Sequence, residues 1–102
     1  MIGLKENEIA QLKNCFSRFK QIEKGILFGS RAMGNYKNGS DVDITLVGES
    51  ISHKTITQIY DFLEETVMPY EFDILIFNSI KNEELIRHIE EFGIEIYCKR
   101  LP

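Results

Sequence analysis

Two groups of chemically suggestive residues lie close together between positions 29 and 43. Gly29 and Ser30 follow a short apolar stretch. Ten residues separate Ser30 from Asp41, and one valine separates Asp41 from Asp43. A glycine after a buried strand lets the backbone approach a phosphate closely, and the residues that follow offer free N–H groups and a hydroxyl. We therefore expect Gly29 and Ser30 to hold phosphates.

The carboxylates predict a metal site. Side chains two residues apart in a strand share a face, so Asp41 and Asp43 are expected side by side, with the apolar residues between and after them on the opposite, buried face. The two carboxylates of such a pair repel each other, so a cation is expected to bridge them. Ligation by oxygen atoms alone suits Mg²⁺. Asp73 lies in a later apolar run and can join the pair if the two strands are neighbours. Three carboxylates, metal ions and a triphosphate are the components of phosphoryl or nucleotidyl transfer.

The other polar residues near these motifs have less specific interpretations. Arg31, directly after the turn, suits a triphosphate contact, but it could equally anchor the loop to a helix. His53 and His88 are expected to cap or decorate helices, and neither is assigned a role because no neighbour in the sequence makes it a metal ligand or a general base.

Helical and strand periodicities alternate along the chain. An amphipathic helix over 6–20 has Glu8 and Lys13 on its solvent side, and a second helix has apolar positions from Ile56 to Val67, with a cap near Ser52 and a stop at Pro69. The remaining expected elements are strands at 25–28, 42–47 and 71–77, one or two helical turns at 30–35, a helix ending at Gly93, and a short edge strand at 94–98. This order predicts an α/β or α+β fold, with helices packed on a small mixed sheet.

Composition limits the function classes. The 102 residues support one domain, 1–102, with 43% hydrophobic and 27% charged residues, as in ordinary globular proteins. The net charge of −4 argues against broad binding of a nucleic-acid backbone. Cys15 and Cys98 are isolated and read as reduced, partly buried thiols, which favours the cytoplasm. No export signal or membrane-spanning run is apparent, so no membrane association is expected.

The string from Gly29 to Asp43, with Asp73 on a later strand, resembles the signature of the DNA polymerase beta-like nucleotidyltransferase superfamily, and in particular its minimal, MNT-type branch. The resemblance implies the polymerase beta-like palm fold, Mg²⁺, ATP, and a complex with a helical HEPN partner, for which the small protein is the antitoxin. It implies AMP transfer onto a tyrosine of that partner, which blocks its ribonuclease activity. The residues that it implicates are Asp41, Asp43 and Asp73 in catalysis and metal binding, and Gly29, Ser30 and Arg31 in nucleotide binding.

One departure and three hypotheses accompany this resemblance. Met33 stands where the family commonly has a second arginine, so the contact made by that arginine is in doubt here. The chain is either a protein adenylyltransferase acting on a HEPN-type toxin, a small-molecule (antibiotic-type) nucleotidyltransferase with a separate helical substrate-binding chain, or an antitoxin that only masks its partner. All three require a partner, because the chain stops before any substrate domain, and a hetero-oligomer is expected.

Overall fold

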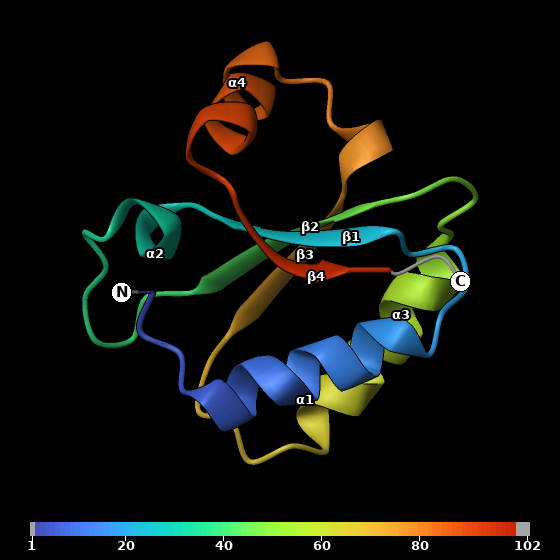
Figure 1. The fold of residues 1–102 in the computed structure, drawn as a ribbon, viewed down its shortest axis with the longest axis horizontal. Helices are drawn as coiled ribbons and strands as arrows, with labels where there is room; N and C mark the ends of the chain where they lie inside the picture. Colours follow the sequence, from blue (N-terminus) through green and yellow to red (C-terminus); the bar gives the residue numbers. More distant parts are fainter. Residues whose placement is uncertain (1, 100–102) are drawn as a thin grey trace.

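A computed structural model describes residues 2–99 as a four-stranded sheet with helices on both faces (Figure 1). The elements, in chain order, are α1 (Glu6–Ser17), β1 (Lys24–Phe28), α2 (Ser30–Met33), β2 (Val42–Val47), α3 (His53–Glu64), β3 (Phe72–Ile76), the 3-10 turn η1 (Phe77–Ser79), α4 (Glu83–Phe92) and β4 (Ile94–Cys98). None of the helices in these residues is long and apolar enough to cross a bilayer.

The sheet is mixed, as the sequence predicts, and its strand order is β3-β2-β1-β4. β1 pairs antiparallel with both β2 and β4, whereas β2 and β3 run parallel. Their registers place Phe28, Asp43 and Asp73 in one row across three strands. The end of β1, which leads into Gly29, therefore lies beside the two aspartates.

The main core lies between the sheet and the pair α1 and α3, which cover the same face (Figure 1). Alternate residues of β2 point into it, and both helices add apolar side chains at helical spacing. The fully buried residues of this core include Leu12, Phe16, Val42, Ile44, Leu46 and Ile59. Because Val42 and Ile44 occupy the core face, the side chain of Asp43 between them is directed to the other face.

That other face carries α4 (Figure 1). The helix begins at Asn82, whose side chain accepts hydrogen bonds from the N–H groups of Glu84 and Leu85 at 2.9 and 3.2 Å. It ends at Gly93, where a Cβ atom would overlap the Ile89 carbonyl and lie 2.6 Å from the side chain of Ile26. Because glycine has no side chain, the end of α4 can pack closely against β1.

Two helices differ from their predicted form. α1 ends at Ser17 rather than at residue 20, and Glu8, expected in solvent, is buried with 6% of its surface exposed. α3 ends at Glu64, so Val67 lies beyond the helix and is 94% exposed instead of packing inward. In both segments the apolar spacing in the sequence continues beyond the residue at which the helix ends. The sequence therefore predicts each helix to be longer than it is.

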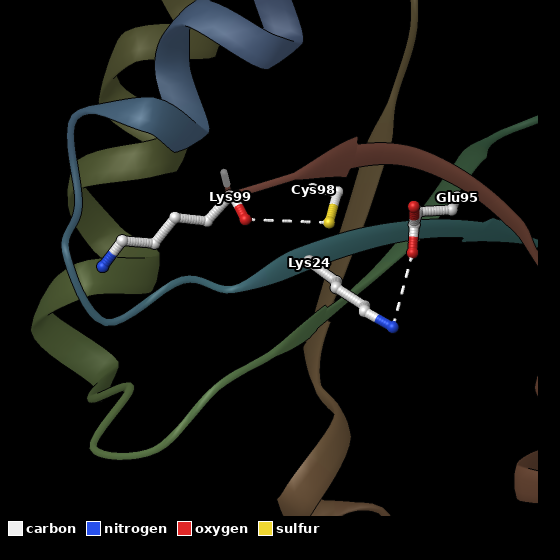
Figure 2. A network of polar contacts seen from close by, with 4 residues as sticks. All are labelled: Lys24, Glu95, Cys98 and Lys99. Carbon is white, nitrogen blue, oxygen red and sulfur yellow. Dashed lines mark hydrogen bonds and ion pairs between the residues drawn. The ribbon is translucent and has the colours of Figure 1, made fainter. Parts of the chain in front are cut away.

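The edge strand β4 is confirmed, and Figure 2 shows its pairing with β1. Lys24 and Glu95 form an ion pair of 3.5 Å between half-exposed side chains, which contributes little stability. The Cys98 thiol donates a weak hydrogen bond to the Lys99 carbonyl at 3.8 Å. Both cysteines are free, but Cys98 is exposed rather than partly buried. Burial raises the pKa of the Cys15 thiol to about 11, so this thiol stays protonated at neutral pH.

The close approach at Gly93 can be tested by Gly93→Ala. The added methyl group must push the end of α4 away from Ile26, and overpacking of this kind costs about 1–3 kcal/mol of unfolding free energy. Urea denaturation measures the loss, with Glu91→Ala on the exposed side of the same helix as the control. Equal stability of the two variants would show that α4 does not depend on this contact.

Candidate active site

Asp43 and Asp73 lie directly opposite one another on the parallel strands β2 and β3. Asp43 is half-buried, whereas Asp73 is exposed because β3 is an edge strand. Asp41 is exposed and precedes the first residue of β2 by one position. The structure thus pairs two of the three predicted acids across strands and places the third at the entry to β2.

The three carboxylates influence one another electrostatically. Burial raises the pKa of Asp43, and the negative charges of Asp73 and then Asp41 raise it further. The positive charge of Arg31 opposes this shift but does not cancel it. The site therefore has a deficit of positive charge centred on Asp43.

A divalent cation fits this deficit. Within residues 2–99 no group of three His, Cys, Asp or Glu side chains lies in an arrangement that could by itself hold a metal ion. Carboxylates that repel each other from neighbouring strands nevertheless form an oxygen donor set suited to Mg²⁺, which binds through a few carboxylates and keeps water or phosphate oxygens. Asp41, Asp43 and Asp73 are the residues that would hold it.

The turn after β1 packs against Asp43. Gly29 has φ 77° and ψ −156°, a conformation that side chains rarely adopt. A Cβ atom at this position would overlap the Asp43 carboxylate, so only glycine brings the backbone this close. Ser30 then begins the single turn of α2, in which the Met33 N–H donates to the Gly29 carbonyl at 3.2 Å. Ser30 is therefore held beside the carboxylates.

Arg31 points away from this turn and into the protein. Its guanidinium donates to the carbonyls of Ser40 at 2.9 Å and of Ile2 and Gly3 at 3.3 and 3.4 Å. Only 4% of its surface is exposed. Of the two interpretations left open by the sequence, these contacts favour the anchor: Arg31 ties the N-terminal segment to the loop that leads into Asp41.

Aromatic rings complete the surroundings of Arg31. The guanidinium carbon lies 5.0 Å from the ring centroids of both Tyr36 and Tyr70. The Tyr70 hydroxyl donates to Glu8 at 2.8 Å, and the same carboxylate oxygen accepts from the Lys5 N–H. Glu8 is thus buried because it caps the start of α1 and binds Tyr70. Burial and this hydrogen bond raise the pKa of Tyr70.

His88 belongs to the site, contrary to the expectation that it only decorates a helix. Its Nε2 atom accepts a hydrogen bond from the Gly29 N–H at 2.9 Å. The available signal was its spacing, because His88 lies three residues after the partly buried Leu85 and next to the buried Ile89 on α4. His53, by contrast, is the exposed first residue of α3.

The small mixed sheet, with a glycine-serine turn beside opposed carboxylates, is the arrangement of the nucleotidyltransferase class of proteins. The family model described as "Polymerase beta, Nucleotidyltransferase" matches residues 10–101. The chain therefore belongs to this family. No curated protein matches the sequence significantly.

Solved structures share the fold at low sequence identity. A toxin–antitoxin crystallised with AMP-PNP matches with a TM-score of 0.73 and 15% identity, over 90% of this chain and 74% of that one. A mutant of the toxin–antitoxin MntA–HpeT matches with a TM-score of 0.68 and 16% identity, over 95% and 75%. The structure of the tri-AMPylated Shewanella oneidensis HEPN toxin with MNT antitoxin gives 0.57 and 17%, over 97% and 74%. The chain thus shares its fold with chains of these toxin–antitoxin complexes.

The role of Arg31 can be tested by Arg31→Lys, which keeps the charge. Lysine cannot reach three carbonyls on two segments with one planar group, so we expect a loss of about 2–4 kcal/mol in unfolding free energy. Chemical denaturation provides the measurement, and Arg87→Lys on exposed α4 is the matched control. A variant with unchanged stability and a raised KM for ATP would instead make Arg31 a phosphate ligand.

The charge deficit predicts a pH-dependent gain of stability in Asp43→Asn. Because the pKa of Asp43 is raised above its ordinary 3.8, the folded protein holds this proton to a higher pH than the unfolded chain does. Wild-type stability therefore falls as pH rises from below 3.8 through the raised pKa, whereas the asparagine variant lacks this loss.

Thermal melting measures the effect. In metal-free buffer at pH 7 the variant should melt above the wild type, and the difference should vanish below pH 3.8. Added Mg²⁺ should raise the melting temperature of the wild type but not of Asp43→Asn. Asp61→Asn, on the exposed side of α3, serves as the control. A lower melting temperature for Asp43→Asn at pH 7 would contradict a raised pKa of Asp43.

Proposed function

We propose that this chain is a Mg²⁺-dependent nucleotidyltransferase that moves AMP from ATP onto a tyrosine of a HEPN-type helical partner, and that it thereby acts as the antitoxin of a toxin–antitoxin pair. The observation that carries the proposal is the register of β2 and β3, which opposes Asp43 and Asp73 beside the Gly29–Ser30 turn. Family membership and the fold shared with toxin–antitoxin structures support it.

In the proposed reaction the role of each residue follows from its position. The Ser30 N–H and hydroxyl face the phosphates from the turn, and Asp41, Asp43 and Asp73 hold the cation. When bound, Mg²⁺ screens the triphosphate and stabilises the charge that develops on its oxygens. Exposed at the sheet edge, Asp73 is the acid that an incoming hydroxyl reaches from solvent.

The chemical step is a displacement at the α-phosphorus of ATP. The acceptor hydroxyl oxygen forms a bond to this phosphorus, its proton passes to Asp73, and the bond to the β-phosphate oxygen breaks to release pyrophosphate. The product carries AMP on the acceptor oxygen. We place the reaction in the cytoplasm, where ATP is present and the free thiols of Cys15 and Cys98 stay reduced.

The test is incubation of the purified chain with its purified helical partner, labelled ATP and Mg²⁺, followed by mass measurement of both chains. A gain of one or more AMP groups on the partner is expected. A partner that stays unmodified while a small hydroxylated compound is labelled would indicate a small-molecule nucleotidyltransferase. Inhibition of the partner with no transfer to any acceptor would indicate masking.

Asp73→Asn separates transfer from masking. The variant should still bind Mg-ATP, because Asp41 and Asp43 remain to hold the cation, and it should still bind the partner. Its transfer rate should fall about 10²- to 10⁴-fold, because the proton acceptor is lost. Calorimetry and co-purification report binding, labelled ATP reports transfer, and Asp61→Asn is the control. If cells that co-express the partner are protected by Asp73→Asn as well as by the wild type, protection does not require transfer.

A further inference from the structure

Within residues 2–99, His88 is the one side chain of α4 that is hydrogen-bonded to the Gly29–Ser30 turn. Its Nε2 accepts the Gly29 N–H at 2.9 Å. A ring nitrogen that accepts a hydrogen bond carries no proton, so the geometry requires a neutral imidazole with its proton on Nδ1. The contact joins residues that are 59 positions apart in the chain.

Aromatic neighbours hold this ring in place. Its centroid lies 6.3 Å from that of Phe28 in an edge-to-face arrangement and 5.5 Å from that of Phe92. The approach of Gly93 to Ile26 fixes the height of α4 over β1. Packing on both sides of the ring therefore fixes the position of His88 Nε2.

The hydrogen bond determines which donors the turn can present. Gly29 adopts its left-handed conformation against the Asp43 carboxylate, and the orientation of its N–H is set by His88. Because the Gly29 N–H is already satisfied, the donors that remain in the turn include the N–H and hydroxyl of the next residue, Ser30. Without His88 as its acceptor, the Gly29 N–H can rotate toward solvent or substrate. Ser30 would then move with it.

We infer that His88 is a positioning residue, which accepts the Gly29 N–H and thereby aims the Ser30 donors at the phosphates of the nucleotide. This role rests on the proposed function, since it concerns the same nucleotide site. It acts on binding of the triphosphate more than on the chemical step, because the turn contacts phosphates that are bound in the ground state as well as in the transition state.

A matched pair of variants isolates the acceptor atom. His88→Gln places an amide oxygen near the position of Nε2, whereas His88→Asn is one methylene shorter and cannot; both lose the ring. We expect His88→Asn to raise the KM and the calorimetric Kd for Mg-ATP about tenfold with kcat changed less than about threefold. His88→Gln and the control Glu91→Ala, on the exposed side of α4, should stay within about threefold of the wild type.

A purely structural role predicts a different result. The two His88 variants would then lose melting temperature alike and, while folded, would bind ATP equally well, which would overturn the inference. Wild-type protein that neither binds nor transfers a nucleotide would instead refute the proposed function itself.

A measurement on the wild type decides the matter even if His88→Asn does not fold. In ¹⁵N-labelled protein the hydrogen bond should give a scalar coupling between the Gly29 nitrogen and His88 Nε2, and this coupling should persist when Mg-ATP shifts the Ser30 amide signal. Absence of the coupling in the free protein, or its loss when Mg-ATP binds, would show that His88 does not hold the turn in the complex.

Discussion

The repulsion between Asp43 and Asp73 is the constraint to which the rest of the structure is fitted. Parallel pairing of β2 and β3 sets these carboxylates opposite each other, and partial burial of Asp43 makes the charge more costly there than in open solvent. Left to relax, like charges on an edge strand would favour a shift of register or separation of the strands. The core on the opposite face prevents this, because Ile44 and Ile74 are both buried in it.

Two clamps of different chemistry hold the segments on either side of the carboxylates. Arg31 binds backbone carbonyls before α1 and before β2, so the loop that delivers Asp41 is tied to the N-terminal segment. On the other side, His88 holds the Gly29 N–H from α4. Both clamps act on main-chain atoms, and they therefore fix the backbone near the site while leaving the aspartate side chains free for a ligand. A fixed backbone around free carboxylates is what the proposed cation and nucleotide site would require.

Arg31 anchors the backbone, although its position in the sequence also suits a phosphate contact. Arg31 follows the glycine-serine pair and would reach a phosphate by its position in the chain alone. In the folded protein Tyr36 and Tyr70 enclose the guanidinium, and its charge reaches Asp43 through space rather than by a direct bond. Met33, two residues after Arg31, is about half-exposed on α2. In the proposed reaction few cationic side chains of this turn would face the nucleotide, so its phosphates would depend on Mg²⁺ and on the donors of Ser30.

Local chemistry in the sequence determined the order of the elements, the mixed sheet and the glycine-serine turn. It also determined that Asp43 faces away from Val42 and Ile44, because alternation along a strand is a property of neighbouring residues. Tertiary structure alone decided the rest: the alignment of Asp43 with Asp73, the burial of Glu8 against Tyr70, the inward course of Arg31 and the reach of His88 to Gly29. These features depend on strand register and on the height and rotation of helices over the sheet. Packing between distant segments sets those quantities, and no local pattern in the sequence encodes them.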